Sequence, residues 1–173
     1  WGCHGYMLDN GMEQFVRDVR VTQIYEGTNG VQALDLLGRK VLQLGLLDRF
    51  TVPAAAELAV ASTDDRLRHL AGPALSAIGL LKESTSLLHL RASDPAEVGS
   101  AASEYLRLFA LTALGYLWTR MARLAVAAGD DAFTSAKLAG AEFYITRILP
   151  QTAALHAAVA AGAVPVMNPA ALH

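Results

Sequence analysis

One long helical segment in the second half of the chain constrains the fold more than any other feature. It has the clearest helix start in the sequence, with Asp94 as N-cap, Pro95 at the first helical position and an acid in the first turn. The pattern runs on to about residue 128, which at 1.5 Å per residue predicts a helix about 50 Å long. Its middle is apolar on more than one face, as in a helix packed between layers. The sequence therefore predicts an all-α fold built around this helix.

Three further helices are predicted around it, over about residues 53–61, 65–92 and 132–161. Pro73 should kink or break the second of them and Pro150 should kink the third, because proline removes a backbone hydrogen bond. The connections are short, which favours antiparallel neighbours. We therefore expect an up-down antiparallel helical bundle over about residues 53–161, followed by a loosely attached tail.

Two shorter helices are predicted before the bundle, over about residues 11–19 and 31–44. Thr28 or Asn29 can cap the second one, and Gly45 can end it. The apolar periodicity then lapses between residues 46 and 53. The expected division is therefore residues 1–47 as an N-terminal part and residues 48–173 as an appended helical-bundle domain.

Charge and composition exclude several kinds of function. Fourteen basic and sixteen acidic residues give a net charge of −2, without the basic excess that a nucleic-acid partner requires. The longest uncharged stretch, residues 148–173, is interrupted by prolines and polar residues, so no membrane span is expected. One cysteine excludes an intramolecular disulfide framework and indicates a reducing, cytoplasmic location. The histidines stand apart from other ligands, so no metal site is expected.

One carboxylate has a setting suited to chemistry. Glu26 lies among apolar and aromatic neighbours, next to Gly27 and just before a predicted helix start. Desolvation makes such a carboxylate more basic, and free N–H groups at a helix start can bind an anion or a developing oxyanion. The same pattern is more common for a glutamate that only caps a helix or lies in a loop. The residues alone therefore favour a structural role for Glu26.

An ordered series of motifs covers residues 2–45. The motifs are GCHGY at 2–6, EQFVRDVR at 13–20, QIYEGTNGVQ at 23–32 and LLGRK at 36–40. The series resembles the end of the acyl-CoA dehydrogenase family, with its Gly-Gly-x-Gly-Tyr turn, its Arg-Asp-Ala helix end and its Ile-Tyr-Glu-Gly-Thr loop. The remaining helices resemble the extra C-terminal domain of the larger bacterial members.

The resemblance implies a flavoenzyme that oxidises an acyl-CoA thioester to the trans-2-enoyl-CoA and passes electrons to an external acceptor. In many members the glutamate of this loop removes the α-proton while a hydride goes to FAD, which places the base at Glu26. Tyr25 would line the acyl pocket. Thr28 and Gln32 would contact FAD, and Gly2 would belong to a turn that packs against the flavin nucleotide of a neighbouring subunit.

The match departs from the family at Cys3, which stands where the turn has its second glycine and would be unfavourable at a positive φ. Some members also place the base on a different helix. The chain opens at Trp1 and reads as a piece of a longer protein, so it is expected to be inactive alone and to form a homo-oligomer. A non-catalytic helical interaction or oligomerisation module is the alternative, with Glu26 as a capping acid.

Overall fold

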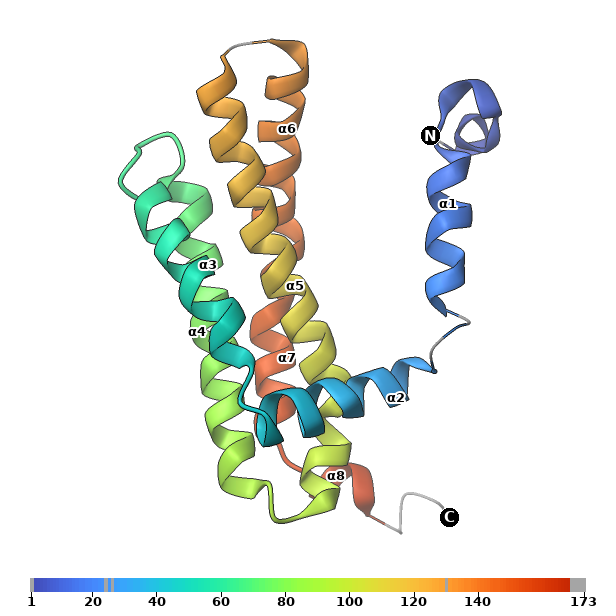
Figure 1. Ribbon diagram of the computed structural model, residues 1–173, viewed down its shortest axis with the longest axis vertical. Coiled ribbons are helices and arrows are strands. Elements are labelled where there is room, and N and C mark those ends of the chain that lie inside the picture. The colour runs from blue at the N-terminus through green and yellow to red at the C-terminus, as the bar shows by residue number, and fades with distance from the viewer. Residues whose placement is uncertain (1, 24, 26, 130, 169–173) are drawn as a thin grey trace.

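A computed structural model gives the architecture of the chain (Figure 1). It describes residues 2–23, 25, 27–129 and 131–168, and every element among them is a helix, with η marking 3-10 or π-helical segments. In chain order, the elements are η1 (Gly2–Tyr6), η2 (Leu8–Asn10), α1 (Glu13–Arg20), η3 (Val21–Gln23), α2 (Asn29–Leu34), η4 (Asp35–Gln43), α3 (Leu47–Ala61), α4 (Arg68–Arg91), α5 (Pro95–Ala128), α6 (Ala132–Phe143), η5 (Tyr144–Ile148), α7 (Gln151–Ala160) and α8 (Val164–Met167). The all-α prediction is confirmed.

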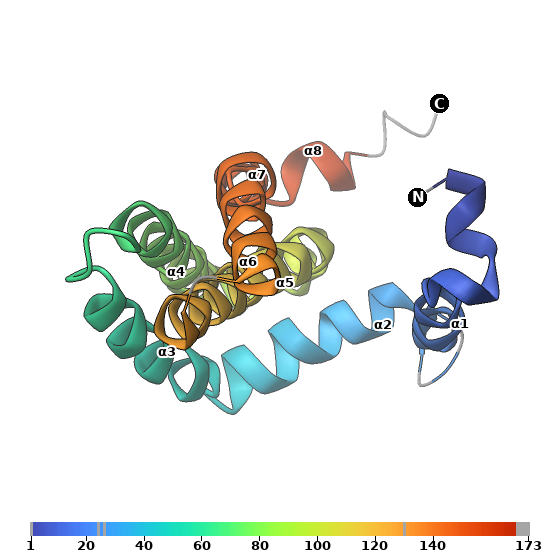
Figure 2. The same ribbon diagram turned by 90° about the horizontal axis from the view of Figure 1, so that it is seen from above.

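Helix α5 is the centre of the bundle, as the sequence predicts. The side chain of Asp94 accepts a hydrogen bond from the N–H of Ala96 at 2.8 Å, and Pro95 is the first helical residue. The helix contacts α2, α3, α4, α6 and α7. Its buried positions include Tyr105, Leu108 and Ala122, which face different neighbours along its length. The buried faces of α5 are therefore packed against several other helices (Figures 1 and 2).

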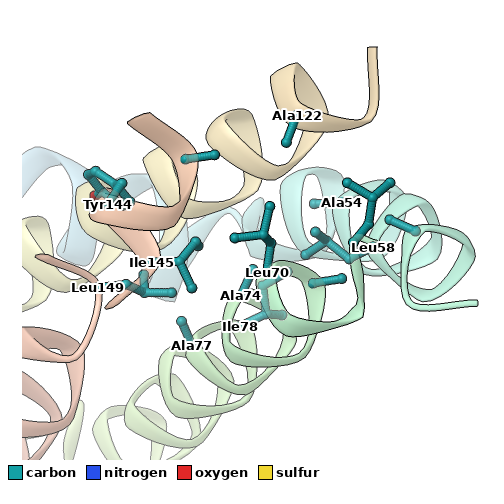
Figure 3. Close-up of a cluster of buried hydrophobic side chains, with 14 residues drawn as sticks. Ala54, Leu58, Leu70, Ala74, Ala77, Ile78, Ala122, Tyr144, Ile145 and Leu149 are labelled. Atoms are coloured by element: carbon teal, nitrogen blue, oxygen red, sulfur yellow. The ribbon is translucent and has the colours of Figure 1, made fainter. Parts of the chain in front are cut away.

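The core has two clusters along α5. Figure 3 shows the first, where Leu58 of α3, Leu70 and Ile78 of α4, and Ile145 of η5 converge near Ala122. The second joins α2 and η4 to α4, α5 and α7, with Leu37 fully buried. The bundle and the helix before it therefore share a hydrophobic core.

Two glycines let helices approach closely. A Cβ on Gly140 of α6 would lie 2.9 Å from Cζ3 of Trp118, and one on Gly115 of α5 would lie 2.9 Å from Cδ1 of Leu149. Such distances are too short for a carbon–carbon contact. The close packing of α5 on α6 and on the turn before α7 therefore requires glycine at positions 140 and 115.

Proline positions explain where the predicted helix bounds hold and where they fail. The third predicted helix is interrupted as expected, because η5 ends at Ile148 and α7 begins just after Pro150. Of the kink or break expected at Pro73, the break does not occur, since α4 runs through this residue as one helix. The expected start at Pro53 is wrong, because α3 begins at Leu47 and contains Pro53 in its second turn. Ala54 and Ala74, which follow these prolines, are buried in the first core cluster.

Two acidic turns differ in what they cap. Asp131 accepts from the N–H of Thr134 at 2.7 Å and the Thr134 hydroxyl accepts from the N–H of Asp131 at 2.9 Å, a capping box that starts α6. Asp64 instead accepts from the N–H of Arg66, two residues before α4 begins. An aspartate side chain therefore caps the start of α6, whereas α4 begins without a side-chain cap.

The C-terminal segment is tied to the bundle just before the tail that the sequence predicts. Glu97 of α5 accepts from the N–H of Ala163 at 3.1 Å, and Arg91 donates to the carbonyl of Ala160 at 3.2 Å. Gly162 adopts a φ of +77° between them, where a Cβ would lie 3.2 Å from the Glu97 carboxylate. Helix α8 follows and contacts α5. Among the described residues the tail is therefore attached as far as α8.

The N-terminal residues divide into a packed part and a part that stands apart. The predicted helix over 31–44 is confirmed as α2 continuing into the π-helical η4, and it lies across the lower half of the bundle (Figure 1). Gly45, at a φ of +63°, ends it, and its N–H bonds the carbonyl of Val41 at 3.1 Å. Helix α1 and the turns before it lie to the side of the bundle in both views (Figures 1 and 2).

Candidate functional site

The loop between η3 and α2 carries the residues that the sequence singles out. Glu26 and Ile24 lie outside the described residues. Tyr25 is 48% exposed. Gly27 has a φ of +106°, and a Cβ there would lie 3.1 Å from Cγ1 of Val31. A side chain at this position would therefore be strained and crowded, which explains a glycine directly after the glutamate.

The structure brings Thr28 and Gln32 together at the start of α2. The carbonyl of Thr28 accepts from the N–H of Gln32 at 3.0 Å, the first hydrogen bond of the helix. Thr28 has an extended backbone (φ −69°, ψ 164°), and its side chain makes no capping hydrogen bond. The amide nitrogen of Gln32 lies 3.6 Å from the position a Cβ on Gly27 would take. The two polar side chains thus lie on exposed residues beside the Tyr25–Gly27 loop.

Gly2 lies elsewhere. It belongs to η1 at the other end of α1, so the described residues do not bring it next to Thr28 and Gln32 (Figure 1). Its φ is +56°, a conformation that favours glycine. Cys3 lies within η1 with an exposed thiol.

A hollow of about 600 Å³ opens between η1 and α1. It is lined mainly by apolar groups, including Tyr6, Met12 and Val16, and it also includes Gly2. Glu13 forms an ion pair with Arg17 at 2.6 Å on the same wall. Sequence reasoning did not find this hollow, because it forms only when the η1 turn folds back on α1.

The charged residues around the motifs pair locally. Arg39 donates to both oxygens of Asp35 at 2.5 and 3.0 Å, within one turn of η4. This hydrogen bond is the main cause that lowers the pKa of Asp35 to about 2. The ion pairs that Arg17 forms with Glu13 and Arg39 forms with Asp35 therefore stay within their own helices.

The bundle holds three polar contacts that sequence reasoning missed. Nδ1 of His156 lies 2.9 Å from Oγ of Ser84, which joins α7 to α4. Glu57 of α3 accepts from the Tyr116 hydroxyl at 2.6 Å and from Arg123 at 2.7 Å. All three contacts join residues more than fifty positions apart, so no local pattern could reveal them. Among the described residues, no group of three or more His, Cys, Asp or Glu side chains could hold a metal ion.

No described helix combines the length and the apolar character needed to cross a membrane.

Comparison with known proteins gives consistent matches along the chain. Residues 49–169 match the family model described as "Acetyl-CoA dehydrogenase C-terminal like", and residues 1–42 match the model "Acyl-CoA dehydrogenase, C-terminal domain".

Three curated relatives illustrate the similarity. The chain is 34% identical over 170 residues to the 3-methylmercaptopropionyl-CoA dehydrogenase of Ruegeria pomeroyi, covering 91% of this chain and 28% of that protein. It is 29% identical over 178 residues to the broad-specificity linear acyl-CoA dehydrogenase FadE5 of Mycobacterium tuberculosis, covering 86% and 27%. An acyl-CoA dehydrogenase of Bacillus subtilis is 56% identical over 34 residues, 20% of this chain and 9% of that protein.

The chain spans little more than a quarter of the length of the two longer matches. The family model over residues 49–169 nevertheless covers more than half of the chain, and the other matches agree with it. The chain therefore belongs to the acyl-CoA dehydrogenase family, of which it carries C-terminal helical regions.

Proposed function

We propose that this chain is the C-terminal part of an FAD-dependent acyl-CoA dehydrogenase in which Glu26 is the catalytic base. The observation that carries the proposal is the match of residues 1–42 to the C-terminal domain of these enzymes, since that stretch contains the Tyr25–Thr28 loop. The reaction converts an acyl-CoA thioester to the trans-2-enoyl-CoA. FAD, when bound, accepts the hydride from the β-carbon.

Glu26 has one task in this reaction, the removal of the α-proton. A carboxylate is a weak base for a carbon acid, so the developing enolate oxygen needs a hydrogen-bond donor at the same moment. The backbone N–H of Glu26 would supply that bond to the thioester carbonyl. Tyr25, whose ring is half exposed in this chain, would line the acyl pocket.

The donors at the start of α2 fit a flavin cofactor. Thr28 has a hydroxyl that is not used for capping, and Gln32 carries an amide on the next turn. Hydroxyl and amide groups of this kind suit the polar atoms of FAD. Gly2 would contribute to a neighbouring subunit's site, consistent with its separation from Thr28 along α1.

The domain division follows from the same matches. We propose residues 1–47 as the end of the catalytic protein's helical domain and residues 48–173 as an appended domain, a division supported by family models that end at residue 42 and begin at residue 49. Helix α1 exposes Phe15 and Val16, 64% and 72% accessible, an apolar surface that a larger assembly would bury. The chain alone should therefore be inactive, and the full protein should form a homo-oligomer that reduces an external electron acceptor.

The test uses the longer protein that carries this chain. Glu26→Gln should lower turnover of an acyl-CoA with an artificial electron acceptor by at least about a hundredfold, because general-base catalysis contributes about 10² to 10⁴. The flavin absorbance should be retained. Glu142→Gln, the same change at an exposed position in α6, is the control and should leave turnover unchanged.

The alternative function makes the opposite prediction. If the Glu26→Gln protein turns over acyl-CoA as fast as the parent, the base is not Glu26. If the longer protein binds no flavin at all, the chain belongs to a non-catalytic helical module.

A further inference from the structure

The loop that carries Glu26 leads directly into a helix that packs on the bundle. The structure describes every residue of α2, and Ala33 is the buried one, with no exposed surface. Outside its own continuation into η4, α2 packs mainly on α5. Ala33 belongs to the same core cluster as Ala102 and Tyr105 of α5. Among the described residues, α5 is therefore the main surface on which α2 rests.

The π-helical turns of η4 keep this helix against the bundle along its length. The buried residues Ala33, Leu37 and Val41 recur every four positions. In an α-helix of about 3.6 residues per turn, each such step would rotate the side chain by about 40° around the axis. A π-helical turn is wider, as the hydrogen bond from the N–H of Leu44 to the carbonyl of Arg39 at 2.9 Å shows. The wider turns reduce the rotation, so all three buried residues reach one core cluster.

One face of α5 receives the segment that runs from α2 into α3. Val98, Ala102 and Phe109 recur at spacings of four and seven, so they lie on one side of α5. All three belong to the cluster that contains Leu37 or pack against it. The ring centroid of Phe109 lies 5.1 Å from that of Phe50 in α3, the helix that follows η4. Ala102, 3% exposed, is therefore a small buried residue on the face of α5 that η4 and α2 cross (Figure 1).

We propose that Ala102 is a positioning residue for the catalytic base, because its small side chain lets α2 approach α5 closely enough to bring the Glu26 loop to the substrate. This inference rests on the proposed function. Thr28 precedes Ala33 by five residues, about 7 Å along the helix. Glu26 is two residues further along the chain and at most about 8 Å from Thr28.

A displacement of α2 at Ala33 would therefore move the base. An error of about 1 Å in the position of reacting groups can lower the rate about a hundredfold, even when the change that causes it is remote. The appended bundle would thus contribute to catalysis through the placement of α2, without touching the substrate.

The test compares two alanine-to-leucine changes on α5 in the longer protein that carries this chain. Ala102→Leu enlarges the side chain on which α2 rests. It should lower kcat about 10- to 100-fold and leave KM for the acyl-CoA within about threefold. Ala122→Leu is the control, since Ala122 is also buried but lies in the other core cluster, about 30 Å further along α5. It should lower the urea midpoint about as much and leave kcat unchanged.

Stopped-flow reduction of the bound flavin separates the chemical step from product release and reoxidation. Ala102→Leu should slow flavin reduction by the same factor as kcat. Replacing the α-hydrogens of the acyl-CoA with deuterium should slow this variant at least as much as the wild type, because removal of the α-proton is the step affected. Flavin absorbance and the urea transition check that each variant is folded. Ala102→Val adds one carbon fewer, so it replaces the leucine variant if that one does not fold, with a decrease in kcat of at least about threefold.

The outcomes separate this inference from the proposed function. If Glu26→Gln abolishes turnover and the folded Ala102 variant reduces flavin at the wild-type rate, the positioning role is wrong and the base stands. The positioning role is also wrong if Ala122→Leu slows flavin reduction as much as Ala102→Leu, or if deuterium has no effect in the Ala102 variant. If Glu26→Gln turns over acyl-CoA as fast as the parent, the proposed base is wrong and the positioning role falls with it.

Discussion

Glu57 is the residue through which α3 is held on α5 by polar contacts. The Tyr116 hydroxyl and the Arg123 guanidinium both donate to it, and the hydrogen bond from Tyr116 is the main cause that keeps the pKa of Glu57 below its ordinary value. A carboxyl with a lowered folded pKa stabilises the fold above its unfolded pKa, and this stability is lost as the pH falls through the folded pKa.

The prediction at this residue is a pH-dependent loss of stability. Glu57→Gln should lower the free energy of unfolding at pH 7 by about 1 kcal/mol, because it removes the charge that both donors bind. The difference from the wild type should shrink as the pH falls below the ordinary value of 4.5, where the wild-type carboxyl also becomes protonated. Urea denaturation at a series of pH values measures it, with Glu142→Gln as the matched control. A difference that is constant with pH would contradict the ionic role of Glu57.

Gly140 allows α6 to pack closely against Trp118 of α5, because glycine has no side chain. A Cβ there would lie 2.9 and 3.1 Å from two ring atoms of Trp118, so Gly140→Ala should destabilise the protein by about 1–3 kcal/mol despite the better helix propensity of alanine. Gly79→Ala in α4 is the control, since no side chain lies within 4 Å of the added carbon. It should stabilise by about 0.5–1 kcal/mol. Chemical denaturation gives both values, and equal signs for the two variants would contradict the close packing on Trp118.

The helices were predictable where their ends are set by neighbouring residues. Asp94 and Asp131 satisfy N–H groups two and three residues away, so their helices start where the sequence indicates. Helix α3 begins at Leu47 without a side-chain cap, and Phe50 in its first turn packs against both core clusters. Tertiary contact sets that start, which is why local signals placed it at Pro53.

In the candidate site too, contacts between residues close in the chain were predictable and contacts between distant residues were not. The loop before α2 was predicted, because Thr28 and Gln32 are joined by one turn of helix. The contact of His156 with Ser84 and the tie between Glu97 and Ala163 were not predicted, since 72 and 66 positions separate their partners. Such pairs follow from how the helices pack, and no spacing along the chain encodes them.

The helix formed by α2 and η4 shares a hydrophobic core with the bundle. Leu37 on this helix is fully buried in the cluster that contains Tyr105 and Leu108 of α5. This helix precedes the proposed domain boundary. Its side chains nevertheless form part of the hydrophobic core of the bundle. Loss of packing at Leu37 should therefore be felt throughout α5.

Leu37→Ala tests this coupling. It should lower the free energy of unfolding by about 2–5 kcal/mol, the usual cost of removing a buried leucine. In a Trp1→Phe background Trp118 is the remaining tryptophan, and it packs on the other core cluster. Its fluorescence transition should shift together with the far-ultraviolet circular dichroism, as expected for one cooperative unit. Leu34→Ala, one turn earlier and 49% exposed, should have a much smaller effect. A Trp118 transition that stays at its original midpoint would mean that α2 and η4 unfold independently of the bundle.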